Sequence, residues 1–160
     1  MLAAQLQLVN VQILENDRQI RVSARSTEIG RRLMEIPGIG PVIASALVAT
    51  VPDPHAFRCG RNLSAWIGLV PKQNSTGGKE RLGSITKQGN RYLRKMLVVG
   101  ALAVIRYAQR NGTRRPWLVQ LMERRTTKVA AVALANKTAR IVWAIMVSGE
   151  RYREPAVQTA

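Results

Sequence analysis

Apolar residues recur at helical spacing along most of this sequence, and that spacing limits the chain to a largely helical fold. The pattern is clearest between Asn90 and Arg110, where the apolar stripe consists of Leu93, Met96, Leu97, Gly100, Ala101, Val104 and Ile105. Aromatic residues make up only 4% of the chain, so its core must be built from Ala, Val, Leu and Ile, a mix that suits closely packed helices. The sequence therefore predicts an all-α fold.

Capping residues and helix breakers divide the rest of the chain into further elements. The expected helices are a short one from Ser26 or Thr27 to about Glu35, an apolar one over residues 42–51, a short one that starts at Asn62 or Ser64, and longer ones over residues 90–110, 117–125 and 128–147. Trp66, in the short helix, is expected to belong to the core. We expect four parts: a coiled-coil-like helix (1–30), a helix-hairpin-helix motif (31–52), the remainder of the domain (53–149) and a flexible tail (150–160).

The first helix carries an apolar seam of its own. Leu2, Leu6, Val9, Ile13, Asn16 and Ile20 follow alternating four- and three-residue steps, which place them on one side of a helix as a coiled coil requires. The alternative is an amphipathic helix that packs on its own domain, and fewer than three heptads do not decide between the two. The seam starts abruptly, as in the C-terminal part of a longer coiled coil. We expect a homo-oligomer that forms through residues 1–25.

A glycine-containing turn separates the second and third helices. The run Ile36-Pro37-Gly38-Ile39-Gly40-Pro41 resembles the turn of the helix-hairpin-helix motif found in DNA-repair and recombination proteins. Gly38 and Gly40 would let backbone N–H groups approach a phosphate at a helix N-terminus, where the helix dipole also favours an anion. Arg31 and Arg32 lie close by in the sequence and favour phosphate contact. The alternative is a plain turn between helices that uses glycine as a C-cap.

The net charge points to a polyanionic partner. Twenty-five Lys and Arg against nine Asp and Glu give a formal charge of +16, which favours nucleic acid over a merely well-solvated surface. The most apolar stretches are too short to cross a bilayer or are interrupted by Lys137 and Arg140, so no membrane partner is expected. The N-terminus lacks the pattern of a secretory signal, so we expect a cytoplasmic protein. The single Cys59 and single His55 cannot assemble a zinc site.

One polar, glycine-rich stretch, residues 72–89, interrupts the helices and carries the candidate chemistry. Seven basic residues and one acid, Glu80, lie between Lys72 and Lys95, so Ser75 is surrounded by positive charge. A serine hydroxyl can attack a phosphodiester, and the charge that develops there would be stabilised by guanidinium, ammonium and backbone N–H groups. A loop of this composition can also hold a phosphate without reacting, and the residues alone do not separate these roles.

Three ordered motifs identify a family. The stretches IPGIGPVIASALVA, AWIGLVPKQNSTGGKERLG and ITKQGNRYLRKML lie between Ile36 and Leu97, and LANK and ARIVW follow between Leu134 and Trp143. Together they resemble the IS110/IS116/IS902 family of bacterial insertion-sequence transposases, the Piv-like recombinases that are guided by a bridge RNA. The resemblance covers about residues 10–148, and it implies a bacterial cytoplasmic protein associated with the nucleoid.

The resemblance implies roles for individual residues. In such proteins an N-terminal DEDD domain of RuvC-like fold holds divalent metal, a coiled coil follows, and a C-terminal domain supplies the nucleophilic serine. By this resemblance the nucleophile is Ser75, with Thr76 as the alternative, and the partners are DNA and a guide RNA. The residues expected to contact nucleic acid are Gly38, Gly40, Lys72, Lys79, Arg81, Lys87, Arg91 and Arg94.

The sequence departs from this family pattern in its acidic residues. Its only aspartates are Asp17 and Asp53, and Glu80 is the only acid between residues 54 and 122. Two-metal chemistry needs clustered carboxylates, so we expect no metal or other cofactor in this chain, and Mg²⁺ in the missing DEDD domain. Two interpretations stay open: a serine recombinase that acts only together with a DEDD domain, or a non-catalytic nucleic-acid-binding module or truncated remnant.

Overall fold

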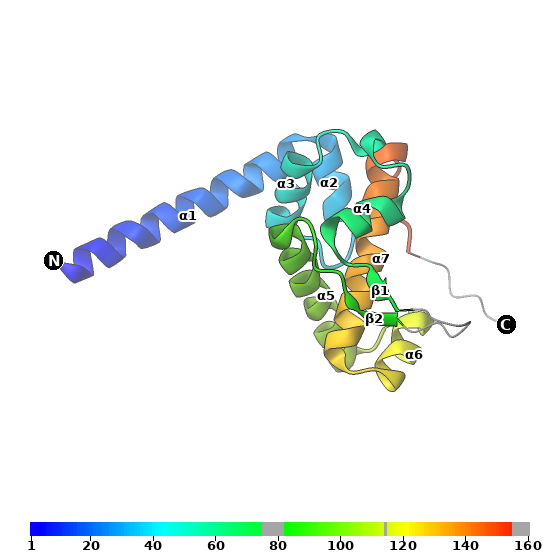
Figure 1. Ribbon diagram of the computed structural model, residues 1–160. Helices are drawn as coiled ribbons and strands as arrows, with labels where there is room; N and C mark the ends of the chain where they lie inside the picture. Colours follow the sequence, from blue (N-terminus) through cyan, green and yellow to red (C-terminus); the bar gives the residue numbers. More distant parts are fainter. Residues whose placement is uncertain (75–81, 114, 155–160) are drawn as a thin grey trace.

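The computed structural model describes residues 1–74, 82–113 and 115–154. Within these residues the chain forms seven α-helices, one short 3₁₀ turn and one small antiparallel sheet (Figure 1). The elements are α1 (Leu2–Ser26), α2 (Glu28–Met34), α3 (Pro41–Thr50), η1 (Pro54–Ala56), α4 (Gly60–Ile67), β1 (Pro71–Gln73), β2 (Leu82–Ile85), α5 (Arg91–Asn111), α6 (Pro116–Arg124) and α7 (Thr127–Ser148). The predominance of helices confirms the expected all-α class.

Helix α7 is the centre of the fold. It packs against α2, α4, α5 and α6, and the interface with α5 is the most extensive (Figure 1). Most of the residues that α7 buries are small, among them Ala130, Ala131, Ala135 and Ala139, so neighbouring helices can approach closely. By length and composition alone α7 could cross a membrane. Its apolar character is accounted for by the four helices that pack around it.

Two glycines determine how closely the hairpin formed by α2 and α3, which we call the helical hairpin, packs against α5. A methyl group on Gly38, whose φ is +90°, would lie 2.8 Å from the carbonyl oxygen of Gly100, and a methyl group on Gly100 would meet the carbonyl oxygen of Gly38. The turn after α2 therefore lies directly on the α5 backbone. Helix α2 ends at Met34, and its C-cap is Glu35 in right-handed conformation. Gly38 is therefore not the C-cap, and the plain-turn alternative fails in that respect.

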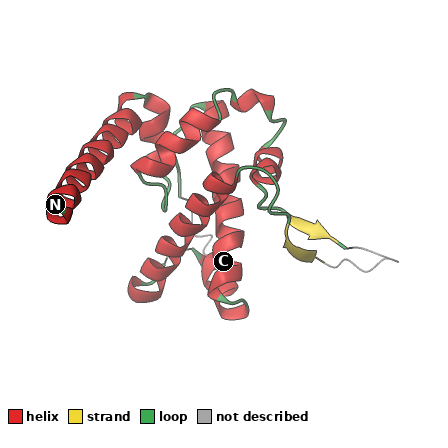
Figure 2. Cartoon of the chain, turned by 60° about the vertical axis from the view of Figure 1, so that its left-hand side comes forward, coloured by secondary structure: helices red, strands yellow, loops and turns green. Residues whose placement is uncertain are grey.

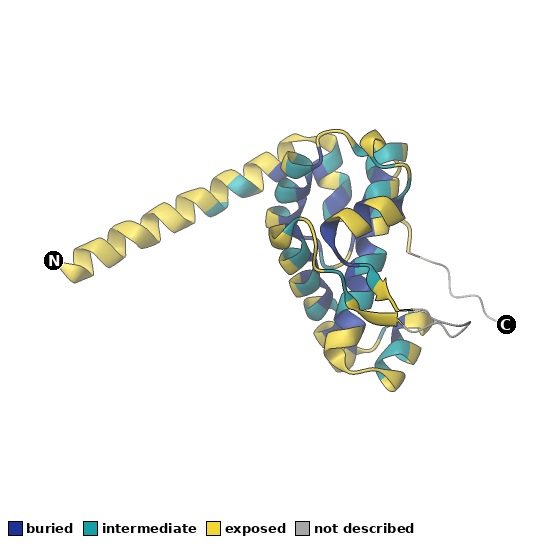
Figure 3. Cartoon of the chain, viewed as in Figure 1, coloured by how far each residue is buried: buried dark blue, intermediate teal, exposed yellow. Residues whose placement is uncertain are grey.

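Helix α1 projects from the body, whereas its C-terminal end is fixed (Figure 1). The hydroxyl of Thr27 accepts a hydrogen bond from the Gly30 N–H at 3.1 Å and caps α2, as one of the two expected candidates. Ala24 is the only buried residue of α1, and the apolar side chains of its first four turns are exposed (Figure 3). The alternative that the seam packs on its own domain is therefore wrong for residues 2–16.

Helix α4 and the η1 turn differ in detail from the expected pattern. Helix α4 starts at Gly60, two residues before the first expected start, and Trp66 is 39% exposed rather than part of the core. The Trp66 ring instead rests against Phe57, with a centroid separation of 5.5 Å. Trp143 of α7 is partly buried against the core, and its indole N–H donates to the carbonyl oxygens of Pro54 and Phe57, each at 3.1 Å.

The polar stretch contains the largest difference from expectation. It was expected to be a loop, but β1 and β2 pair across it, with Pro71 opposite Ile85 and Gln73 opposite Leu82 (Figure 2). Three or four residues on each side are too few to show the alternation of a half-buried strand, and most of them are exposed. Pairing of the two backbones, rather than burial, defines these strands.

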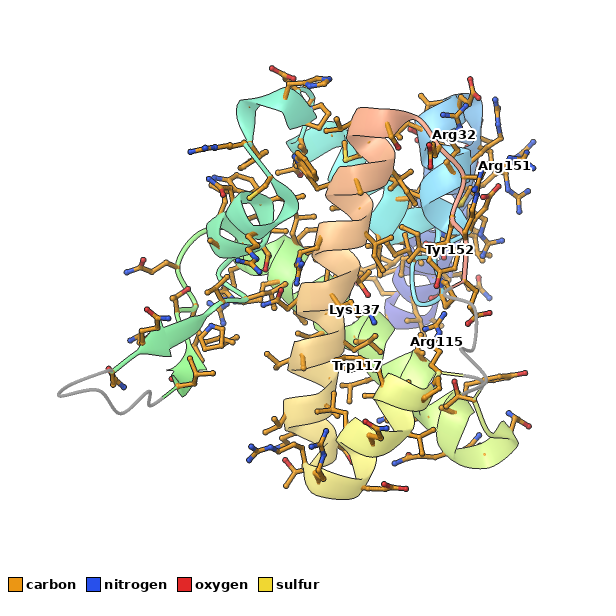
Figure 4. All side chains as sticks on the ribbon, turned by 90° about the vertical axis from the view of Figure 1, so that its right-hand side faces the viewer. Arg32, Arg115, Trp117, Lys137, Arg151 and Tyr152 are labelled. Carbon is orange, nitrogen blue, oxygen red and sulfur yellow. The ribbon has the colours of Figure 1, made fainter. Side chains whose placement is uncertain are left out.

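The first residues after α7 lie against the body, where a flexible tail was expected from residue 150. The Arg115 guanidinium donates to the Tyr152 hydroxyl at 3.1 Å and to the Glu154 carboxylate at 2.8 Å (Figure 4). Burial raises the pKa of Tyr152, Arg115 counteracts this effect, and Glu154 adds to it. The remainder of the expected tail, residues 155–160, lies outside the described residues.

Candidate nucleic-acid interface

The two strands carry the segment that contains the candidate nucleophile. We call the β1–β2 pair the serine ribbon, because Ser75 lies in the segment that joins the two strands. Four residues of the sequence-based site, Ser75, Thr76, Lys79 and Arg81, lie outside the described residues, and their roles stay predictions. The structure does describe how both ends of that segment are held.

The base of the serine ribbon is seated on the C-terminal end of α4. The Lys87 N–H donates to the Gly68 carbonyl at 3.1 Å, and the Thr86 N–H donates to the Val70 carbonyl at 2.9 Å. Glycines permit this close approach: a methyl group on Gly68 would lie 2.9 Å from the Gln88 nitrogen, and one on Gly89 would meet the Trp66 carbonyl group. The segment before β1 and the segment after β2 are thereby joined by backbone hydrogen bonds.

Arg94 completes this attachment. Its guanidinium nitrogen Nη1 donates to the carbonyl oxygens of Ile67, at 2.8 Å, and of Gln88, at 3.1 Å. One charged side chain on α5 therefore joins the end of α4 to the loop between β2 and α5, and its bond to Ile67 is part-buried. The sequence-based expectation placed Arg94 on nucleic acid. The structure places it within the protein framework, and a contact with nucleic acid stays a prediction.

A second contact from the core was not foreseen in the sequence. The side-chain amide of Asn136, on α7, donates to the Leu69 carbonyl at 3.0 Å and fixes the residues just before β1. The available signal was an amide residue that follows the apolar run over residues 129–135, because a polar group next to a buried stretch requires a hydrogen-bond partner. The serine ribbon is thus held by α4, α5 and α7 together.

The remaining basic residues of the expected site surround the ribbon with exposed charge. Lys72 lies in β1, Lys87 follows β2, and Arg91 lies in the first turn of α5. The side-chain oxygen of Asn90 caps this helix by accepting a hydrogen bond from the Leu93 N–H at 2.9 Å. None of these three cations pairs with a carboxylate of the described chain. They are therefore available to a polyanion.

The helical hairpin presents a smaller potential phosphate site than expected. Gly38 faces Gly100, whereas Gly40 has open space where a side chain would lie, at the N-terminus of α3. The Arg31 guanidinium donates to the Arg25 carbonyl at 2.8 Å, and Arg32 pairs with Glu28, so both arginines already have partners within the chain. A phosphate contact at Gly38 and Gly40 stays a prediction, and Gly40 is the position open to it.

No divalent-metal site fits the described residues. They contain no group of three or more His, Cys, Asp and Glu side chains close enough to hold a metal ion. The Mg²⁺ that the resemblance implies would require clustered carboxylates, which the described chain does not supply.

Comparison with known proteins agrees with the motifs. The model of the transposase IS116/IS110/IS902 family matches residues 30–115. A Pseudomonas aeruginosa protein named "Probable family 20 transposase" is 47% identical over 93% of the present chain. The transposase for insertion sequence element IS1111A of Coxiella burnetii is 43% identical over 86% of the present chain. The transposase for insertion sequence element IS1328 of Yersinia enterocolitica is 38% identical over 86%. The chain covers 44%, 38% and 42%, respectively, of these relatives' own lengths. With more than half of its residues matched by the family model, the chain belongs to the IS116/IS110/IS902 family of transposases.

Proposed function

We propose that this chain is the part of a DNA transposase that holds DNA and a guide RNA and supplies Ser75 as the nucleophile for strand cleavage and exchange. The observation that carries the proposal is the attachment of the serine ribbon. Three helices hold its base through Arg94, Asn136 and backbone hydrogen bonds, although its strands bury little surface. A reactive group needs a scaffold of this kind, because small displacements of a nucleophile reduce its reactivity sharply.

The proposed step is a transesterification at phosphorus. The Ser75 oxygen forms a bond to the phosphorus, the bond from phosphorus to one sugar oxygen breaks, and that sugar oxygen leaves with a proton as a hydroxyl. The step exchanges one phosphoester bond for another, so the bond energy is kept in the phosphoserine ester. The reverse attack by a sugar hydroxyl can therefore rejoin a strand. Lys72, Lys87 and Arg91 surround the ribbon with positive charge that favours the phosphorane over the ground state.

The oligomer and the guide RNA form the second part of the proposal. Leu2, Leu6, Val9 and Ile13 are each at least 47% exposed, an arrangement that a partner helix would cover. A formal charge of +16 is sufficient for contact with both DNA and structured RNA. We infer that α1 pairs with a second copy, while the body carries the nucleic acid.

A chimaeric transposase tests the proposal. Residues 1–160 would replace the matching part of the Pseudomonas aeruginosa relative, and strand transfer and DNA affinity would be measured for the parent, Ser75→Ala and Thr76→Ala. We expect Ser75→Ala to abolish strand transfer and to leave DNA affinity within about twofold, because one hydroxyl adds little to an interface dominated by charge. If strand transfer is lost in Thr76→Ala but not in Ser75→Ala, the nucleophile is Thr76. Full strand transfer by Ser75→Ala would leave a non-catalytic binding module as the function.

A further inference from the structure

A groove lies along α7, beside the base of the serine ribbon. Its volume is about 1010 Å³, and its walls come from the start of α4, from Trp117 of α6 and from Pro71 of β1. One face of α7 forms the floor, including Asn136, Lys137 and Arg140. Figure 4 shows the side chain of Lys137, on α7, close to that of Trp117, on α6. We call this feature the α4–α7 groove.

The charged residues of the groove all have the same sign. A methyl group on Gly60 would lie 3.0 Å from the Cα and the carbonyl oxygen of Arg140, so α4 crosses α7 at this point and Arg61 lies next to Arg140. Both arginines also line an adjoining hollow that includes Asn136. Lys137 lies nearly one turn before Arg140 on the floor. No lining residue is acidic, and none of the three cations pairs with a described carboxylate.

An aromatic side chain lies at one end of these cations. Trp117 is 39% exposed, and the Lys137 ammonium nitrogen lies 4.5 Å from the centroid of its ring. Proteins that hold single-stranded nucleic acid combine a positively charged groove with aromatic rings on which unpaired bases stack. A base in a duplex is already stacked and paired, so only an unpaired strand can use Trp117 in this way.

Asn136 connects the groove to the candidate chemistry. This residue lines the floor, and its side-chain amide also donates to the Leu69 carbonyl just before β1. Pro71, the first residue of β1, forms part of the wall. A strand that follows the cations of the groove therefore runs to the base of the segment that carries Ser75.

We propose that the α4–α7 groove binds a single DNA strand through its phosphates and leads it to the serine ribbon. Arg61, Lys137 and Arg140 contact successive phosphates, and Trp117 stacks on an unpaired base. The inference rests on the proposed function in one respect, namely that the bound strand is the strand that Ser75 attacks. The groove itself and its DNA ligand do not depend on the reactivity of Ser75.

Affinity for single-stranded DNA tests the groove. A fluorescein-labelled mixed-sequence strand of about 12 nucleotides, within the usual range for one binding module, would be titrated with the Ser75→Ala chain at several salt concentrations. Arg61→Gln/Arg140→Gln removes two charges from the groove, and Arg18→Gln/Arg21→Gln is the matched control, because it removes two charges from exposed positions on α1. Circular dichroism and thermal unfolding check that each variant keeps its fold.

We expect the groove variant to lose at least tenfold in affinity and to reduce the slope of log K against log salt by about 1.4, or about 0.7 for each lost phosphate contact. The control should lose less than threefold. Trp117→Leu should lose about tenfold on the single strand and little on a duplex of the same sequence, because only unpaired bases stack on the ring. Equal losses in groove variant and control would overturn the proposal, and so would an equal effect of Trp117→Leu on duplex DNA. Because every measurement uses Ser75→Ala, an incorrect nucleophile assignment would not alter these results.

Discussion

At the scale of single residues, the contact between Gly38 and Gly100 allows the hairpin to lie against α5. Gly100→Ala would place a methyl group against the Gly38 carbonyl oxygen, which is backbone and cannot move aside easily. The gain in helix propensity, about 1 kcal/mol, offsets only part of this clash. We expect a net loss of about 1–3 kcal/mol in the free energy of unfolding, measured by urea denaturation.

Gly40→Ala is the matched control for Gly100→Ala. Gly40 has a φ of −94° and open space beside it, so alanine meets no clash and should cost about 0.5–1 kcal/mol, through the weaker N-cap alone. A larger loss in Gly40→Ala than in Gly100→Ala, or no loss in Gly100→Ala, would contradict this view of the hairpin.

Arg94 illustrates what the sequence alone cannot distinguish. Its place in a basic run correctly marked it as part of the site region, but a guanidinium that binds backbone carbonyls and one that binds phosphate look the same in a sequence. Lys95, the next residue, is exposed, whereas Arg94 is bound to Ile67 and Gln88. Only the packing of α4 against α5 separates the two roles.

Removing Arg94 should affect the position of the serine ribbon more than nucleic-acid affinity. In the chimaeric transposase we expect Arg94→Ala to reduce strand transfer at least tenfold and to destabilise the fold by about 1.5–3 kcal/mol, the range for hydrogen bonds to a charged group. The salt slope of DNA binding should stay within experimental error of the parent. Lys95→Ala, on the same helix, should keep strand transfer and stability. If Arg94→Ala lowers the salt slope by about one unit, Arg94 contacts phosphate instead.

At the scale of secondary-structure elements, helices were predictable and the strands were not. Thr27 and Asn90 mark helix starts by their caps, and the stripe from Leu93 to Ile105 defines the buried face of α5. The serine ribbon gives no such signal, because its strands are short, exposed and defined by pairing with each other. Its attachment depends on Asn136, which is more than 60 residues away in the sequence.

Helix α1 should control the oligomeric state. An isolated helix with so few contacts is marginally stable in water, and its exposed leucines and isoleucine need a partner. We expect the chain to be oligomeric by light scattering, and Leu6→Asp/Ile13→Asp to be monomeric with the body still folded. Leu8→Asp/Val11→Asp changes two exposed residues away from the seam, so this variant should weaken the oligomer less than Leu6→Asp/Ile13→Asp does. A monomeric parent would contradict the pairing.

At the scale of the whole molecule, the positive charge should dominate binding. If about six phosphates are contacted, affinity for duplex DNA should fall about a thousandfold between about 50 and 200 mM salt, because each contact releases condensed counterions. Fluorescence anisotropy with DNA of two unrelated sequences measures both this dependence and the sequence preference, which should be small. Affinity that stays constant over this salt range would exclude the electrostatic account.

In the proposed step Ser75 becomes covalently joined to DNA, and this adduct can be trapped. The chimaeric transposase would be incubated with insertion-element ends that carry a nick near the cleavage point, so that the short leaving fragment diffuses away and the adduct accumulates. Denaturing electrophoresis would detect the adduct, and peptide mapping by mass spectrometry would locate it. We expect a phosphodiester on Ser75 that is absent in Ser75→Ala. Cleaved DNA with no covalent adduct, or an adduct on a residue outside the segment between β1 and β2, would contradict it.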